Sequence, residues 1–377
     1  MHLIKSISIG IAAFASLFFN QNEVFAAEKF SVDASSAKMY LDMAGNAIDG
    51  ELPADAQWEA LFNSPAYKAL LDNTQWDKNA FKSNVRGAFE IVFDPQNSQK
   101  CDSILSVLNS LDNLRDELPF YVSTAYNIRK NLNDYTTLLS SLNMDDVVND
   151  ADSLALALLP KKGEGLTAQS SPIYLIVWDL ESRSLGGGLF LDLNSALHSD
   201  VTGLKEILGH EMHHFYLGPV FETIYANDVM DGAVAALVFN MREGVADIIN
   251  KKKMPTESLF PYGEKICEQY NADYLNSPKV LEELDNVTCA YLDQKLPIEE
   301  YFNKAIGCAH YEGHTTGDYM VFLIRDRLGL DAVVESVGDL DAFVDNYNKA
   351  AKMAGTYVFS DKFTNHIHSV SQSAKRK

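Results

Sequence analysis

The strongest constraint on the fold is a short motif, His-Glu-Met-His-His, at residues 210–214. Apolar residues recur around it at helical spacing, which predicts that the motif lies on a helix. Side chains four residues apart project from one face of a helix, so His210 and His214 can bind the same metal ion. Glu211 lies beside them, where it can take a proton from a metal-bound water. The motif therefore predicts a metal site on a helix.

A second predicted helix, from about residue 229 to residue 250, carries two acidic residues. Glu243 and Asp247 are four residues apart, and the small residues between them allow close packing. Two histidines and Glu243 leave a fourth metal position open for water, which is typical of catalytic rather than structural zinc sites. Asp247 can accept the other ring N–H of His210, a partner that metal-bound histidines usually have.

Local signals delimit both helices. We expect the first helix to end at Gly218-Pro219, because proline disfavours helix continuation. The lysines at 251–253 complement the dipole at the end of the second helix. Two pairs of residues are natural N-caps for the two helices: Ser199 or Asp200, and Asp228 or Asp231.

The two motifs together, His210-Glu-Met-His-His214 and Glu243-Gly-Val-Ala-Asp247, resemble those of the gluzincin metallopeptidases, the group that includes thermolysin and the zinc aminopeptidases. The resemblance implies that the two histidines and Glu243 bind Zn²⁺. It also implies that Glu211 activates the water and that Asp247 orients a histidine. The gap from His214 to Glu243 is longer than in thermolysin, which predicts an extra loop or turn near residues 218–227.

Gluzincins also supply a tyrosine or histidine from a downstream segment to stabilise the oxyanion of the tetrahedral intermediate. The resemblance therefore implies that the oxyanion donor lies in residues 308–320. The candidates there are His310, Tyr311, His314 and Tyr319. His314 is the first candidate because it precedes a glycine-containing helix start, and Tyr311 is the second. The choice between them stays open at this point.

Most of the chain is also similar to an uncharacterised bacterial family of zinc-dependent peptidases. Three stretches carry that similarity: Gln57 to Phe62 with Tyr67, the glycine strand that begins at Gly186, and His314 to Met320.

The remaining sequence predicts helices over residues 33–150 and a surface loop over residues 160–171. Two strands follow, at about 172–178 and 186–193. The second strand contains three glycines, for which an ordinary bulge or hairpin turn is one explanation. The other is an edge strand that binds an extended peptide by strand addition, with Gly187, Gly188 and Leu189 as the substrate-binding residues.

These patterns predict an α+β fold that is mostly helical, with a zincin-like catalytic core and a small sheet beside the motif helix. We expect an N-terminal helical region over residues 27–160 and a catalytic region over residues 161–377. The two regions can also pack as one compact unit.

Residues 1–26 predict a signal peptide, with Lys5 before a short apolar run and a cleavage site at Val24-Phe25-Ala26. The run is too interrupted for a membrane span, so we expect export to the periplasm or the medium without stable membrane insertion. The four cysteines are compatible with an oxidising compartment. A net charge of −21 argues against nucleic acid as a partner.

The sequence thus predicts an exported zinc peptidase that acts on a peptide or protein substrate. The alternative is a zincin-fold protein that binds zinc and peptides without catalysis. A further alternative is a helical interaction protein with an accidental motif, in which the ligand nitrogens and the Glu243 oxygens would not converge.

Overall fold

The structure is a computed structural model that describes residues 29–107, 118–160, 170–178, 181–198, 201–225, 231–251 and 264–375. The expected signal peptide and the expected N-caps Ser199, Asp200 and Asp228 lie outside these residues. Within the described part of the chain, no helix is both long and apolar enough to cross a membrane.

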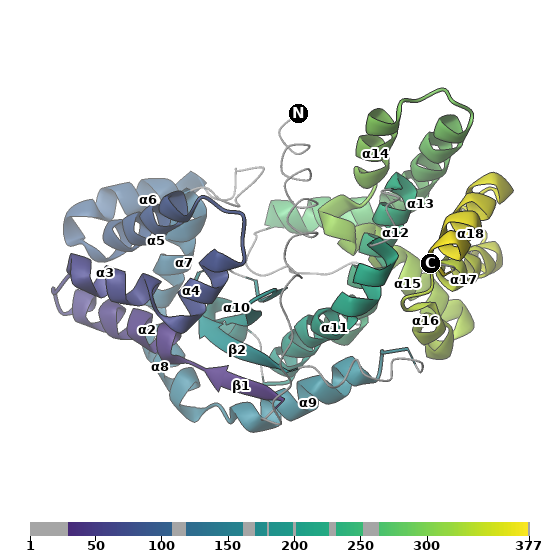
Figure 1. Cartoon of the computed structure of the whole chain (residues 1–377). Helices are drawn as coiled ribbons and strands as arrows, with labels where there is room; N and C mark the ends of the chain where they lie inside the picture. Colours follow the sequence, from purple (N-terminus) through teal and green to yellow (C-terminus); the bar gives the residue numbers. More distant parts are fainter. Residues whose placement is uncertain are drawn as a thin grey trace.

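The first half of the chain folds into helices around a small sheet (Figure 1). Their apolar stripes follow the helical period, and the described residues between 33 and 150 form helices as predicted. The helices are α2 (Ser35–Ile48), α3 (Asp55–Phe62), α4 (Pro65–Asp72), α5 (Lys78–Phe93), α6 (Ser98–Val107), α7 (Leu118–Lys130), α8 (Leu132–Ser141) and α9 (Met144–Leu156).

The sheet has four strands in the order β1-β2-β4-β3. The strands β1, β2 and β4 are parallel, and β3 is antiparallel to β4. Sequence patterns predicted two of these strands; the other two are short and lack a strong alternation. The strands are β1 (Phe30–Asp33), β2 (Ser171–Ile176), β3 (Arg183–Leu185) and β4 (Gly188–Asp192).

Of the two explanations for the glycine run, the structure shows the hairpin turn and not the edge strand. Gly187 lies in the turn between β3 and β4, while Gly188 and Leu189 belong to β4, which is paired on both sides. A Cβ on Gly187 would lie 2.4 Å from the side-chain nitrogen of Asn73, and one on Gly188 would lie 2.9 Å from the carbonyl oxygen of Pro172. The glycines therefore allow the protein's own packing, and β3 is the edge strand on this side of the described sheet.

The motif helix is α11 (Val201–Tyr225), which follows the short helix α10 (Leu193–His198). It does not end at Gly218-Pro219 as predicted, because Pro219 lies inside it. An internal proline loses one backbone hydrogen bond and costs about 3 kcal/mol. Here Tyr216 and Leu217, both fully buried just before it, favour continuation of the helix. The longer gap before Glu243 is thus taken up partly by helix rather than by a loop.

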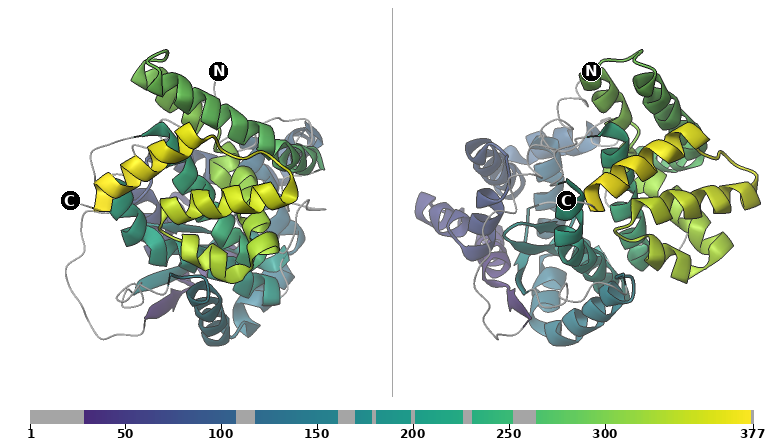
Figure 2. Two further views of the ribbon diagram at one scale, coloured as in Figure 1. Left: turned by 90° about the vertical axis from the view of Figure 1, so that its right-hand side faces the viewer. Right: turned by 45° about the vertical axis from the view of Figure 1, so that its right-hand side comes forward.

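Helix α12 (Gly232–Asn250) follows and is buried along nearly its whole length. The described residues that follow α12 are mostly helical, and Figure 2 shows the last helices gathered on the side of the molecule away from the sheet. They are α13 (Glu264–Leu292), α14 (Ile298–Ile306), α15 (His314–Leu328), α16 (Leu330–Ser336), α17 (Leu340–Ala354) and α18 (Asp361–Lys375). The mostly helical α+β class is therefore confirmed. The four cysteines form no disulfide.

Buried apolar side chains form two clusters. The first runs from Ala37 to Tyr216 and includes the sheet and one face of α11. The second runs from Leu158 to Ile367 and includes α12, α15 and the C-terminal helices. The division between the clusters thus falls within α11, and the sheet belongs with the N-terminal helices. The expected region boundary at residue 160 stays a prediction.

Candidate metal centre

Helix α11 has two different faces at the motif. Leu204, Leu208 and Met212 recur every four residues and are almost completely buried in the first cluster. His210 and His214 project from another face, toward α12. Packing against the first cluster therefore fixes the rotation of the helix and with it the direction of both imidazoles.

Helix α12 starts at a well-formed cap. The carboxylate of Asp231 accepts hydrogen bonds from the backbone N–H groups of Ala233 and Val234, so Asp231 is the N-cap. From that start, Glu243 and Asp247 fall on one face, which meets α11. The structure thus brings both carboxylates to the two histidines of the motif.

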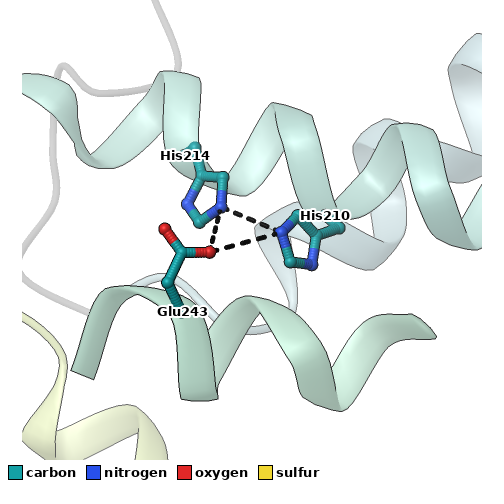
Figure 3. A group of neighbouring side chains, drawn as sticks. All are labelled: His210, His214 and Glu243. Atoms are coloured by element: carbon teal, nitrogen blue, oxygen red, sulfur yellow. Dashed lines mark hydrogen bonds and ion pairs between the residues drawn. The ribbon is translucent and has the colours of Figure 1, made fainter. Parts of the chain in front are cut away.

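The donor atoms of His210, His214 and Glu243 converge on one point (Figure 3). The Nε2 atoms of the two histidines are 2.9 Å apart. Glu243 Oε2 lies 3.0 Å from His214 Nε2 and 3.6 Å from His210 Nε2. A tetrahedral zinc with bonds of roughly 2.0–2.1 Å needs its donors about 3.3 Å apart, so the group fits zinc. This convergence argues against an accidental motif.

Burial and neighbouring charges suit this site to a cation. Burial lowers the pKa of His214 to about 3, and the nearby Arg242 adds to that effect. His214 is therefore neutral, the form that binds metals. Burial opposes a charge on His210, yet the carboxylates of Asp247 and Glu243 raise its pKa well above the usual value. The same carboxylates favour a metal cation at this position.

The other ring nitrogen of His210 faces two oxygens of α12. Its Nδ1 lies 3.2 Å from the side-chain oxygen of Asn250 and 3.2 Å from Asp247 Oδ1. The hydrogen-bond geometry favours Asn250, and Asp247 Oδ1 accepts no well-aligned bond from the described residues. Asn250 accepts the proton on Nδ1 and the nearby Asp247 carboxylate favours a proton there by its charge, which leaves Nε2 free to bind a metal.

His314 comes to the site from α15. Its Nδ1 lies 2.7 Å from Asp247 Oδ2, and its Nε2 lies 3.5 Å from Glu243 Oε2. Asp247 thus contacts two imidazoles from two different helices. His314 is the candidate oxyanion donor that the structure brings to the ligands.

Close backbone contact between α12 and α15 positions His314. A Cβ on Gly317 would lie 2.1 Å from the carbonyl oxygen of Asn240, and one on Gly244 would lie 2.4 Å from Gly317. Larger residues at these positions would separate the helices. The turn before His314 is left-handed at Tyr311, at Glu312 and at Gly313, with φ values of 50°, 59° and 102°. Left-handed backbone at a tyrosine is uncommon and is often found at functional sites.

Tyr311, the second candidate, lies further from the ligands. Its ring packs against Tyr270 at a centroid distance of 5.1 Å. Burial and the carboxylate of Asp273 raise its pKa to about 12. Among the described residues, no hydrogen bond or ion pair joins Tyr311 to His210, His214 or Glu243.

Glu211 is buried next to the ligands, with 9% of its surface exposed. Burial is the main cause that raises its pKa to about 7; the charge of Glu243 adds to this effect, and that of His210 opposes it. A carboxylate with this pKa can both accept and release a proton near neutral pH.

Several residues at the site were not predicted from the sequence. Arg242 Nε lies 3.2 Å from His214 Nδ1 and 3.5 Å from Glu243 Oε1. Asn250 and Lys251 lie one helical turn after Asp247, and that spacing could have revealed them. Tyr270 and Asp318 come from distant segments, and no local pattern indicates them.

A buried His-His-Glu donor set on two adjacent helices defines a metal-binding protein of the kind that leaves a coordination position open. The chain belongs to the family described as "Putative zinc dependent peptidase (DUF5700)", which matches residues 58–356. Zinc is therefore the metal that this site binds. No curated protein and no solved structure matches the chain.

Proposed function

We propose that the protein hydrolyses peptide bonds, with Glu211 as the general base and acid and His314 as the oxyanion donor. The observation that carries this proposal is the buried Glu211, which follows the ligand His210 in the chain and lies close enough to His210 and Glu243 for their charges to act on it. Zinc bound to these ligands supplies a Lewis acid, which makes a bound water more acidic and polarises a carbonyl group.

The protein's own residues divide the remaining work. The Glu211 carboxylate takes a proton from the attacking water and delivers it to the nitrogen of the leaving amine. Asp247 holds His314 at Nδ1, so that Nε2 faces the ligands. A ring that also carries a proton on Nε2 donates to the oxygen of the tetrahedral intermediate.

The edge strand β3 supports a peptide as the substrate. It packs against α11, and its outer side carries no partner strand in the described sheet. An extended peptide added there would run beside the motif helix and expose its carbonyl groups to the site. The proposed position for strand addition is therefore Arg183–Leu185 and not the glycine run.

A Glu211 variant distinguishes the peptidase from the alternative, a zinc- and peptide-binding protein without catalysis. In Glu211→Gln, the side chain keeps its shape but cannot accept a proton. We expect this variant to retain one zinc per chain by elemental analysis and to cleave a peptide library on the order of 10²–10⁴-fold more slowly. Glu206→Gln, on the same helix, is the matched control and should keep full activity. Wild-type protein that contains zinc and cleaves no peptide would refute the catalytic proposal.

We also propose that the protein is exported after removal of residues 1–26, on the basis of the signal-peptide pattern. Expression of the full chain should yield a mature protein that begins at Ala27 and is found outside the cytoplasm. N-terminal sequencing of the fractionated protein tests this, and an intact N-terminus in the cytoplasm would contradict it.

A further inference from the structure

A second group of polar side chains lies behind the metal ligands, on the far side of Asp247. It consists of Lys251, Tyr270 and Asp318, which come from the end of α12, from α13 and from α15. Asp318 is completely buried, Tyr270 is 5% exposed, and the side chain of Lys251 is 15% exposed. Neither the motifs nor the family assigns a role to these residues.

Lys251 is the centre of this group. Its Nζ lies 2.6 Å from Asp247 Oδ2, 2.8 Å from the hydroxyl of Tyr270 and 3.6 Å from Asp318 Oδ2. It also lies 3.4 Å from His314 Nδ1. A lysine at the end of a helix is usually solvated, whereas this one points inward to a carboxylate.

The charges in this group balance around Asp247. Burial and the carboxylate of Asp247 raise the pKa of Asp318 well above its usual value. Of the two aspartates, Asp318 is therefore the neutral one. Burial opposes the charges on Lys251 and Asp247, but their mutual attraction outweighs it. One buried cation and one buried anion therefore stabilise each other, as buried charges require.

Asp247 connects this ion pair to the reacting side of the site. Its Oδ1 faces Nδ1 of His210, and its Oδ2 accepts from Nδ1 of His314. Displacement of Asp247 would therefore disturb a metal ligand on α11 and a candidate oxyanion donor on α15 at the same time.

We propose that Lys251 is a positioning residue of the site: by anchoring Asp247, it fixes the orientation of both His210 and His314. The role at His314 rests on the proposed function, whereas the role at His210 rests only on zinc binding. The two can therefore be tested separately.

The first test measures the zinc dissociation constant by competition with a chelating dye. In Lys251→Met the chain length is kept and the charge is lost, and we expect zinc binding to weaken about 10- to 100-fold, as for other residues that orient metal ligands. Lys251→Arg should recover at least half of that loss on a logarithmic scale. Lys304→Met is the matched control, because Lys304 forms an exposed ion pair with Glu300, also four residues apart, and zinc binding should stay within twofold.

A folded Lys251→Met variant that binds zinc within twofold of the wild type would overturn the proposal for His210. If circular dichroism shows that this variant is unfolded, Tyr270→Phe decides instead. It removes only the hydroxyl that contacts Lys251 and Asp318, and it should weaken zinc binding several-fold. An unchanged dissociation constant in Tyr270→Phe would then overturn the proposal.

The second test measures kcat and KM with zinc at saturation. Lys251→Met should lower kcat about 10- to 100-fold with little change in KM. In a His314→Ala background the same substitution should lower kcat less than threefold, because its effect passes through His314. An equal factor in both backgrounds would indicate a general structural role and overturn the proposal for His314. Zinc-loaded wild type without activity would refute the peptidase function. The zinc dissociation constants alone would then decide whether Lys251 positions His210.

Discussion

Helices α11 and α12 each contribute metal ligands, but they pack in different ways. α11 places Leu204, Leu208 and Met212 in the first apolar cluster and turns its histidines toward α12. α12 is buried on nearly all sides within the second cluster, and its two carboxylates are themselves buried. One helix is a boundary between two cores, and the other is the centre of a core.

This difference explains how the site is built. A buried carboxylate needs compensating partners, so α12 brings Glu243 and Asp247 together with Lys251 and with His314 from α15. α11 needs only correct rotation, which its apolar face supplies. The metal ligands therefore come from two separate cores, and zinc binding should stabilise the placement of one core against the other.

The largest expected effect comes from removing the zinc that joins the two helices. Chelation, or Glu243→Ala, should abolish peptide cleavage. Zinc at about 100 to 1,000 times its dissociation constant should raise the free energy of unfolding by roughly 2.7–4.1 kcal/mol. Thermal unfolding with and without zinc measures this. Equal midpoints in the two conditions would show that the ligands do not couple the cores.

Two buried methionines sharpen the comparison between the cores. Met212 belongs to the first cluster and Met241 to the second, and both are completely buried. Each methionine-to-alanine change should lower the free energy of unfolding by about 2–5 kcal/mol. Hydrogen exchange should show lost protection around α9 and the sheet in Met212→Ala, and around α15 and α17 in Met241→Ala. Uniform loss across the molecule in both variants would contradict two separate cores.

The sequence predicts the parts of this site that depend on helical spacing. His210, His214, Glu243 and Asp247 could be placed because residues four apart share a face. The local signature of a cap reduced the start of α12 to Asp228 or Asp231. Contacts between distant segments could not be predicted. The bond from Asp247 to His314 depends on the packing of α12 against α15, and the inward direction of Lys251 depends on Asp318 and Tyr270.

The sequence gives one wrong prediction here and leaves one choice open. The local preference of proline predicts a helix end at Gly218-Pro219, and the run of glycines is compatible with either a hairpin turn or an edge strand. In the folded chain, burial of Tyr216 and Leu217 keeps α11 intact through Pro219. The glycines at 187 and 188 make room for Asn73 and Pro172. Tertiary contacts decided both cases.

The contact between α12 and α15 predicts an intermediate effect. Gly317→Ala would place a Cβ 2.1 Å from the carbonyl oxygen of Asn240, so the helices must separate. We expect a loss of about 1–3 kcal/mol in the free energy of unfolding. We also expect a roughly 10- to 100-fold lower kcat through displacement of His314, with zinc content unchanged. Gly87→Ala is the control, because nothing lies within 4 Å of its Cβ, and it should be neutral or stabilising. Unchanged kcat in Gly317→Ala would argue against positioning of His314 by this contact.

The smallest expected effect compares one helix cap from each half. Asp77 caps α5 at the surface, whereas the buried Asp231 caps α12 and also contacts Tyr301 and His366. Replacing Asp77 by alanine should cost about 1 kcal/mol, and replacing Asp231 up to about 2 kcal/mol, in urea unfolding at pH 7.

Burial raises the pKa of Asp231, but the bonds from His366 and Tyr301 lower it more, to below 3.8. Its carboxylate therefore stabilises the fold above pH 3.8, and this contribution is lost as the pH falls through the lowered pKa. The difference between wild type and Asp231→Ala should accordingly shrink below pH 3.8, and a difference that grows on acidification would refute this assignment.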